Sequence, residues 1–311
     1  MHRILSELSR VNGESPSIHA AQYTSIGTEV SRLPMPTLIS RRSLLYAGAA
    51  LPALAKPPAS TGPLVDYHVH LDAVVTLEKA LQISRERGVK FGIVEHAGRK
   101  ENRYPGLLSS DEDLNRYIAM LEGKPVLKGI QAEGLDWMSC FSRETIAKLD
   151  YVLSDALTFP EKDGRLVRLW TPAARIDDKQ DFMDRYVAFH VEVMAREPLD
   201  ILANVTFLPA AIDAEYDALW TPARMKKVID AAVRYGVAIE INARYRLPRM
   251  PFLKLARSAG AKFSFGSNIH GTDVGKLDYC VEAARELGLR TADLFAPAPP
   301  GRKPVERRKF T

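Results

Sequence analysis

Apolar strand-like segments alternate seven times with helix-like segments between residues 64 and 287, and this alternation restricts the fold more than any other feature. Strands joined through helices run parallel and cross over with a right-handed turn. The sequence therefore predicts an α/β fold, a distorted seven-stranded (β/α)7 barrel of the TIM type, with an open doubly wound sheet as the structural alternative. The expected strands cover residues 64–70, 89–96, 126–132, 151–157, 200–207, 237–243 and 262–267, and the helices cover 77–87, 111–121, 143–149, 179–196, 222–236, 252–258 and 275–287.

The positive charge of the chain is concentrated near its two ends. The formal net charge is +5, and five Arg against three Glu give residues 1–55 a charge of +2. Five basic residues against Glu306 give residues 301–311 a charge of +4, which leaves −1 for residues 56–300. A near-neutral body does not have the basic surface that nucleic-acid binding requires, so we expect no nucleic-acid partner.

The first 55 residues have the order of an export signal. Arg41 and Arg42 precede a mild apolar run over residues 44–54, and Ala53-Leu54-Ala55 is a small-x-small cleavage pattern. Paired arginines in this position are typical of bacterial twin-arginine signals. The run is shorter than the about 20 residues of a membrane span. We expect export by the twin-arginine machinery to the periplasm or medium, without a stable membrane span after cleavage. The alternative is a chance Arg-Arg pair before a buried helix.

The rest of the chain divides by composition. Residues 56–62 contain Pro57 and Pro58 and predict a linker. Residues 63–295 hold the seven strand–helix units and predict the barrel. Residues 296–311 are rich in Pro and then basic, which predicts a loose tail.

Potential metal ligands gather where the expected strands end. His68 and His70 are two residues apart on the first strand, so their side chains point to the same face. Active sites of parallel barrels lie at this end of the strands. Imidazole and carboxylate donors suit Zn, Mn or Fe better than Ca or Mg. We therefore expect one shared divalent metal site formed from His68, His70, His96, Glu133, Asp155, Asn204, Asn268 and His270.

Three residues on expected elements are interpreted separately. Glu240 lies in an almost continuous apolar strand, where an unpaired carboxylate would be unfavourable, so we expect it to face a metal or a cation. Asn204 is equally compatible with capping a loop. His190 falls in the middle of a helix and receives no role.

The ordered set of motifs resembles the PHP family, the polymerase and histidinol phosphatase metal hydrolases. The resemblance covers most of residues 63–288 and implies a distorted seven-stranded barrel, up to three divalent metals and hydrolysis of phosphate esters. The motifs are Asp66-x-His68-x-His70, Glu95-His96, Glu133, Glu240-Ile241-Asn242 and Gly266-Ser267-Asn268-Ile269-His270.

The chain departs from that family pattern at three strand ends. Asn268 stands where the family has Asp, Asn204 replaces a His, and Leu157 or Asp155 lies near the place of a missing His. A donor set with fewer histidines favours one or two metals over three.

The catalytic expectations follow from the proposed metal. His270 or Asp155 could move the proton while a metal-bound water attacks phosphorus. Arg244 and Arg246 follow the sixth strand and could bind the phosphate, with Arg99 as a further candidate. The expected substrate is a small phosphate ester.

Two alternative functions remain open. An amidohydrolase-type barrel also opens with His-x-His, but that family implies a Lys at the fourth strand and an Asp at the last, where this chain has Asp155 and Asn268. The other alternative is a degenerate barrel that binds a metal or ligand without turnover.

Overall fold

The computed structural model describes residues 64–102, 104, 106–269 and 271–308. The expected export signal, the linker, the candidate ligand His270 and residues 309–311 lie outside the described residues. Every described residue belongs to one unit that begins at Ala55.

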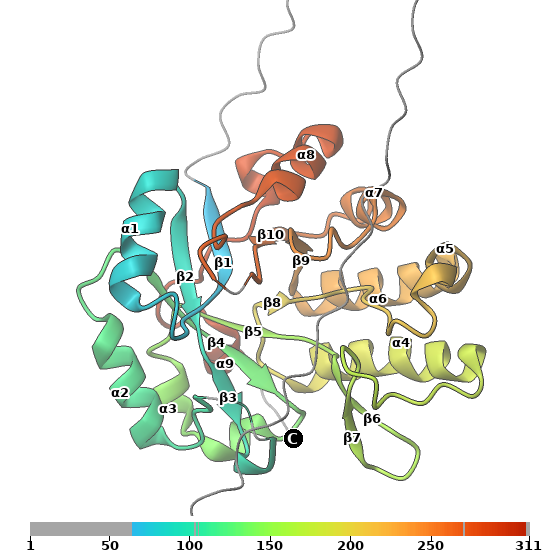
Figure 1. Cartoon of the computed structure of the whole chain (residues 1–311), viewed down its shortest axis with the longest axis horizontal. Coiled ribbons are helices and arrows are strands. Elements are labelled where there is room, and N and C mark those ends of the chain that lie inside the picture. Colours follow the sequence, from blue (N-terminus) through green and yellow to red (C-terminus); the bar gives the residue numbers. More distant parts are fainter. Residues whose placement is uncertain (1–63, 103, 105, 270, 309–311) are drawn as a thin grey trace, which may run out of the picture. The chain divides into compact units, whose positions relative to one another are not determined.

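The predicted barrel is confirmed. Seven parallel strands follow one another in the order β1, β2, β4, β5, β8, β9, β10 and form a nearly closed barrel surrounded by helices (Figure 1). The Asn268 N–H donates to the His68 carbonyl oxygen at 3.0 Å, so the two edge strands adjoin. The strands are β1 (Val65–His70), β2 (Lys90–Val94), β4 (Leu127–Glu133), β5 (Tyr151–Ser154), β8 (Ile201–Leu202), β9 (Ala238–Asn242) and β10 (Phe263–Gly266), and a short β3 (His96–Gly98) also pairs with β4.

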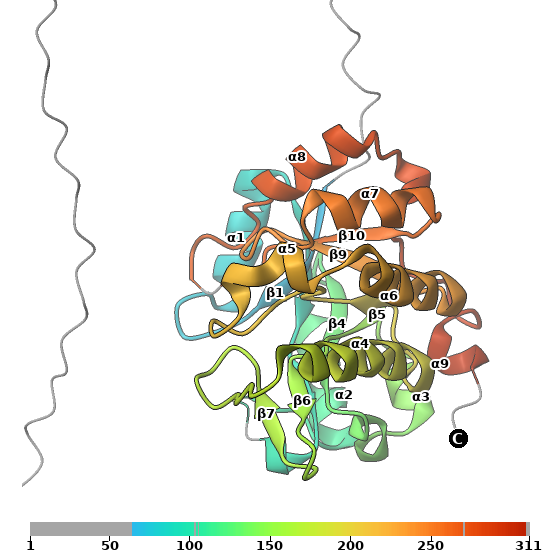
Figure 2. The same ribbon diagram turned by 90° about the vertical axis from the view of Figure 1, so that its right-hand side faces the viewer.

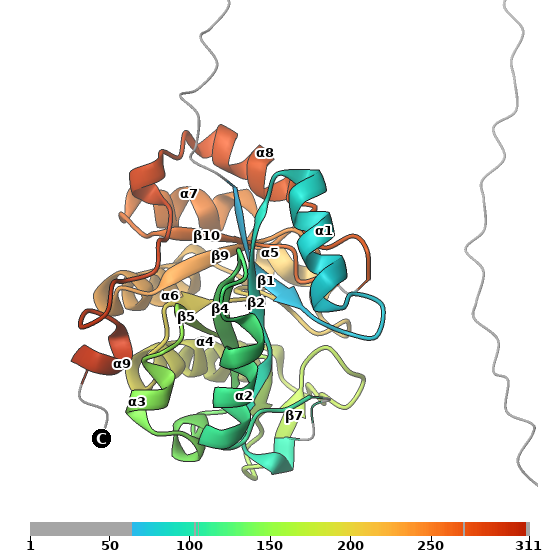
Figure 3. The ribbon, with the colours of Figure 1, turned by 90° about the vertical axis from the view of Figure 1, so that its left-hand side faces the viewer.

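The helices lie on the outside of the barrel. In Figure 1, α1 to α3 lie on one side and α4 to α7 on the other, and Figures 2 and 3 show these two sides face on. No helix among the described residues is long and apolar enough to cross a membrane. The helices are α1 (Leu77–Arg87), α2 (Asp111–Leu121), α3 (Arg143–Ile146), α4 (Lys179–Arg196), α5 (Tyr216–Leu219), α6 (Pro222–Tyr235), α7 (Met250–Ser258), α8 (Asp278–Leu287) and α9 (Pro304–Arg307).

Local capping explains why several helix bounds agree with the sequence. The Thr76 hydroxyl accepts from the Lys79 N–H at the start of α1, and Gly88 ends that helix with φ 63°. Ser110 and Asp178 cap α2 and α4 in the same way. All three helices have the predicted bounds.

Three expected strands differ from the structure by more than one residue at an end. The segment 151–157 ends as β5 at Ser154. The segment 200–207 contributes only the two residues of β8, because Asn204 and Thr206 have φ values of 52° and 71° that turn the chain out of the sheet. The segment 89–96 is divided between β2 and β3. The sequence also missed an antiparallel hairpin of β6 (Thr158–Pro160) and β7 (Leu166–Arg168).

The barrel interior is filled by side chains. Tyr151 is buried there, and its hydroxyl donates to the Tyr67 carbonyl oxygen at 2.7 Å. Gly92 and Gly129 make room for this ring, since a Cβ at either position would lie 2.4 Å from an atom of Tyr151. The barrel interior around Tyr151 is thus a packed core and not a pore.

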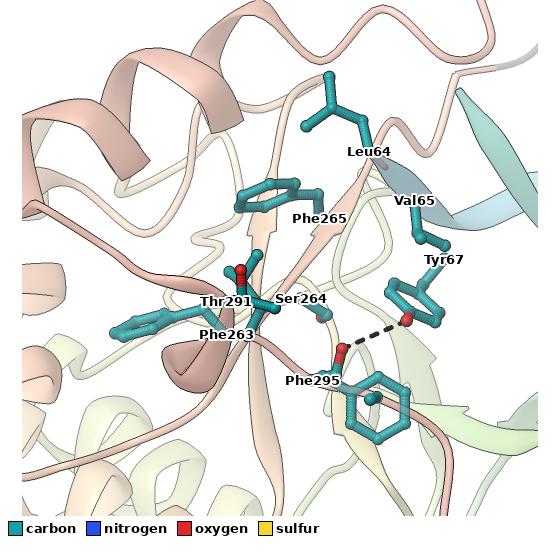
Figure 4. Close-up of a pocket in the computed structure, with 10 residues that line it drawn as sticks. Leu64, Val65, Tyr67, Phe263, Ser264, Phe265, Thr291 and Phe295 are labelled. Carbon is teal, nitrogen blue, oxygen red and sulfur yellow. Dashed lines mark hydrogen bonds between the residues drawn. The ribbon is translucent and has the colours of Figure 1, made fainter. Parts of the chain in front are cut away.

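An apolar cavity of about 190 Å³ lies at the amino-terminal ends of β1 and β10 (Figure 4). Tyr67 lines it and donates its hydroxyl to the Phe295 carbonyl oxygen at 3.3 Å. The residues that line it bring no cluster of titratable groups, so this cavity does not supply the chemistry expected at the other end of the strands.

The expectation of a loose tail was wrong for the described residues up to Arg308. Lys303 Nζ donates to the carbonyl oxygens of Ala147 and Leu149 at 2.6 and 2.5 Å, and Val305 is buried. The Arg308 guanidinium donates to carbonyl oxygens at the end of α4 and just after it. These cations bind carbonyl groups at or near helix ends, where positive charge is favourable.

Asp200, just before β8, predicts a pH dependence of stability. Its buried carboxylate accepts from the Val152 N–H at 2.8 Å, and burial raises its pKa to about 7. The folded chain therefore binds a proton that the unfolded chain lacks, so stability from this group is present below about pH 4 and is lost as the pH rises through about 7.

Asp200→Asn should thus gain at least about 1 kcal/mol relative to wild type between about pH 5 and pH 8. Urea unfolding across this range measures the difference. Asp230→Asn, on the exposed side of α6, is the control. Parallel pH profiles of wild type and Asp200→Asn would contradict the prediction.

Candidate functional site

Buried polar side chains converge at the carboxyl ends of the barrel strands. They come from β1, β4 and β9 and from the residues just after β5, β8 and β10. Buried polar groups need partners, and those in this cluster bond mainly to one another. The buried members are His68, His70, Gln131, Glu133, Asp155, Asn204, Glu240, Asn242 and Asn268.

His68 and Glu240 form the central buried pair. His68 Nδ1–H donates to Glu240 Oε1 at 2.6 Å, and the other carboxylate oxygen accepts from the Asn204 N–H and from Asn242 Nδ2, both at 2.9 Å. Burial alone would lower the pKa of His68, but the Glu240 carboxylate raises it above the ordinary value. Burial alone would raise the pKa of Glu240, but the imidazolium and these hydrogen bonds hold it low. The cation expected beside Glu240 is therefore His68.

Gly266 on β10 gives this pair its space. A Cβ at this position would lie 2.0 Å from Glu240 Oε1 and 2.8 Å from the His68 Cβ. Around the barrel, β10 lies between β9 and β1. The hydrogen bond between His68 and Glu240 therefore crosses β10 at Gly266, where a side chain would not fit.

Gln131, which the sequence analysis missed, lies at the point where the imidazoles meet. Its Oε1 accepts from Nε2 of both His68 and His70 at 3.0 Å, and its Nε2 donates to Asp155 Oδ2 at 3.2 Å. Its spacing of two residues from Glu133 on β4 places both side chains on one face and is the signal that could have found it.

Asn204 binds Asp155, and two further asparagines bind Asn204. Asn204 Nδ2 donates to Asp155 Oδ2 at 2.8 Å, while Asn242 and Asn268 each donate to Asn204 Oδ1 at 3.0 Å. Asn204 thus belongs to the polar network. Asn204 and Asn268 have φ values of 52° and 45°, a conformation that Asn adopts more readily than most residues. Burial and the nearby Glu133 raise the pKa of Asp155 to about 7.

A second group surrounds His96. His96 Nδ1 lies 2.8 Å from Glu133 Oε1, and Thr158 donates its hydroxyl to Glu133 Oε2 at 3.2 Å. The His96 ring stacks on His70, with centroids 4.8 Å apart. Glu133 therefore joins β3, β4 and the β6–β7 hairpin.

Asp66 fixes the loops at this end of the barrel and is not in the network. Its carboxylate accepts backbone N–H groups from His68 and Ser267 at 3.0 and 2.9 Å and from Gly275 at 3.0 Å. The hydrogen bond from the Gly275 N–H to Asp66 holds Gly275 outside the expected helix 275–287, and α8 begins three residues later.

The candidate phosphate-binding arginines have different partners. Arg244 Nη1 donates to the Asn268 carbonyl oxygen at 3.2 Å, next to the network. Arg246 instead pairs with Glu282 on α8 at 3.1 Å. Arg99 pairs with Asp136 at 2.7 Å. Only Arg244 of these three bonds to a residue of the network.

The side chains of this cluster are of the chemical types that bind divalent metals, but in this structure they are not arranged around one common point. Within the described part of the chain, no three His, Cys, Asp or Glu side chains are placed to hold one metal ion. Two imidazole Nε2 atoms and one carboxylate nevertheless surround a single side chain, the amide of Gln131.

Comparison with protein-family models and with curated proteins finds no match.

The His68–Glu240 pair predicts the effect of Glu240→Gln. The amide keeps the shape but removes the charge that faces the buried imidazolium, so we expect a loss of roughly 3 kcal/mol in the free energy of unfolding. The His68 Nδ1 proton should also move upfield in the NMR spectrum, because its short charge-assisted hydrogen bond is lost. The control is Glu192→Gln, which breaks an exposed pair with Arg196 on α4 and should change stability by less than about 1 kcal/mol. Equal stability of the two variants would contradict the assignment.

Proposed function

We propose that this chain is a metal-dependent hydrolase that acts on a small phosphate ester. The observation that carries the proposal is the convergence of His68 Nε2, His70 Nε2 and Asp155 on the Gln131 amide at the carboxyl end of a parallel barrel. Two imidazoles and a carboxylate form a common ligand set for catalytic Zn or Fe. The resemblance to the PHP family supports the same reaction class.

The proposed metal site takes one or two Zn, Mn or Fe ions. When bound, the metal would lower the pKa of a water and neutralise charge on the phosphoryl oxygens. The proposed ligands are His68, His70, His96, Glu133 and Asp155, with Asn204, Asn268 and the undescribed His270 as further donors.

The protein's own groups have separate roles. Glu240 orients the His68 ring through Nδ1 and leaves Nε2 directed at the site. Burial raises the pKa of Asp155 to about 7 in the metal-free chain, so Asp155 would move a proton near neutral pH only where it is not itself a metal ligand. Arg244, whose guanidinium donates to the Asn268 carbonyl oxygen beside the network, is the proposed cation for a phosphate oxygen.

We also infer export of the chain through the twin-arginine machinery, on the strength of Arg41-Arg42 and the cleavage pattern. This route carries folded proteins, so the metal would be loaded before export. A periplasmic or secreted location favours small esters over nucleic acids as substrates.

A barrel that binds a ligand without turnover is the second candidate. It is favoured by the completeness of the network, since Gln131, Asp155 and Asn204 all bond to one another or to their neighbours.

Metal analysis and a substrate panel separate the two candidates. We expect one or two bound equivalents, and hydrolysis of phosphomonoesters in preference to phosphodiesters and amides when Mn or Zn is added. His70→Ala should lower kcat/KM on the order of a hundredfold or more. Lys79→Ala, on the outer side of α1 where the ammonium bonds to Gln82, should not. Bound metal without turnover would favour the binding barrel. Protein that takes up no metal, or three tight equivalents, would contradict the proposal as stated.

The position of Gln131 predicts that its amide competes with the metal. Gln131→Ala should tighten divalent metal binding about tenfold or more, because no buried hydrogen bonds have to be broken first. Calorimetric titration with Zn or Mn measures the change. Gln82→Ala, on the exposed face of α1, is the matched control. Weaker binding by Gln131→Ala would show instead that the amide oxygen is a ligand.

A further inference from the structure

The cavity at the amino-terminal ends of β1 and β10 lies where these two strands do not pair. One edge of β10 pairs with β9. At the amino end of the other edge, the Phe295 N–H donates to the Phe263 carbonyl oxygen at 2.7 Å, and Leu294 forms a bridge with Phe263. The segment 294–295 therefore lies along β10 at this end of the barrel. Residues of β1, of β10 and of the segment 291–296 line the cavity (Figure 4).

The cavity wall is aromatic and carries no charged side chain. The rings of Tyr67, Phe263, Phe265 and Phe295 belong to it, and no Asp, Glu, Lys, Arg or His lines it. Its volume is about 190 Å³. An apolar protein cavity of about 150 Å³ is large enough to bind benzene. This cavity can therefore take one aromatic ring with a few further atoms. A charged ligand would lose its hydration without gaining a partner.

One buried hydroxyl in this wall lacks a hydrogen-bond partner. Ser264, on β10, is 2% exposed, and its Oγ has no partner among the described residues. A buried strand serine ordinarily donates to a carbonyl group, as Ser154 on β5 does to the Ala132 carbonyl oxygen at 3.0 Å. Leaving a buried hydroxyl unpaired is unfavourable, and an apolar residue of similar size would avoid the cost. The Ser264 hydroxyl is thus available to a molecule in the cavity.

The other groups of the wall are already held in place. The Tyr67 hydroxyl donates to the Phe295 carbonyl oxygen at 3.3 Å, and the two rings meet edge to face at 5.1 Å. Tyr67 also meets Tyr151 edge to face at 5.3 Å. A preformed wall loses little conformational entropy when a ligand binds. Thr291 and Ala296 line the cavity and are exposed, so a ligand can enter beside them.

We propose that this cavity is a second binding site, for a neutral molecule of the phenol class that consists of one aromatic ring with a single hydroxyl group. The ring would fill the apolar space among the aromatic side chains. The hydroxyl would pair with Ser264 Oγ, since each of the two groups can both donate and accept. The polar network lies at the other end of the strands, so this ligand is separate from any molecule that reacts there. The inference does not depend on the proposed hydrolase function.

The test compares p-cresol with p-xylene, which have the same shape and differ only by a hydroxyl in place of a methyl group. Calorimetry and ligand-observed NMR measure their binding to the full-length protein without added metal. The same ring with a carboxylate, 4-methylbenzoate, tests the exclusion of charge. Ser264→Ala removes the unpaired hydroxyl. Ser154→Ala is the matched control, because that buried hydroxyl has its partner outside the cavity.

We expect wild type to bind one equivalent of p-cresol with a Kd between about 10 μM and about 1 mM, and 4-methylbenzoate not measurably. In Ser264→Ala, the affinity for p-cresol relative to p-xylene should fall about tenfold, because the ligand hydroxyl loses its partner. Binding of p-xylene should be retained in this variant, which shows that the cavity persists. Ser154→Ala should keep the wild-type ratio.

Three results would overturn the proposal. Absence of saturable p-cresol binding would show that the Ser264 hydroxyl is satisfied by water alone. An unchanged ratio of the two affinities in Ser264→Ala would place the bound ligand elsewhere on the protein. Binding of 4-methylbenzoate as tight as that of p-cresol would exclude an uncharged cavity as the site. Loss of hydrolase activity bears on none of these measurements, so failure of the proposed function is distinguishable.

Discussion

The buried pair of His68 and Glu240 is the interaction on which the polar end of the barrel depends. It joins the first strand to β9, and each partner keeps the other charged in a place where either alone would be unfavourable. Once the ring is fixed through Nδ1, its Nε2 can face only the centre of the barrel. The positions of Gln131, Asp155 and the asparagines then follow from the hydrogen bonds that each remaining polar atom requires.

Sequence reasoning succeeded where the signal is local. The caps Thr76, Ser110 and Asp178 fix helix starts within a few residues, and strand–helix alternation determines the parallel barrel. It failed where distant partners decide. The chain leaves the sheet after Leu202, where the Asn204 N–H donates to Glu240 on β9, and Gly275 is held away from α8 by Asp66 on another strand.

The candidate site shows the same division. His68, His70, Glu133, Asp155, Asn204 and Asn268 could be selected from strand ends, and the structure brings them to one end of the barrel. Gln131 was missed because a neutral amide is a weak metal ligand by type, although it lies at the centre. The basic tail was misread because the carbonyl acceptors of Lys303 and Arg308 belong to α4 and to residues 147–149, far away in the sequence.

The close approach of Glu240 and His68 to Gly266 has a consequence for how substitutions at this barrel are interpreted. A scan of substitutions through β10 would find Gly266 as intolerant as an active-site residue, although it has no side chain and could contact no substrate. Even a methyl group would overlap both partners of the buried pair. Sensitivity at this position would therefore report the room that β10 must leave for a pair joining the strands on either side of it. Substitution data for the barrel mouth need to separate residues that act from residues that must stay small.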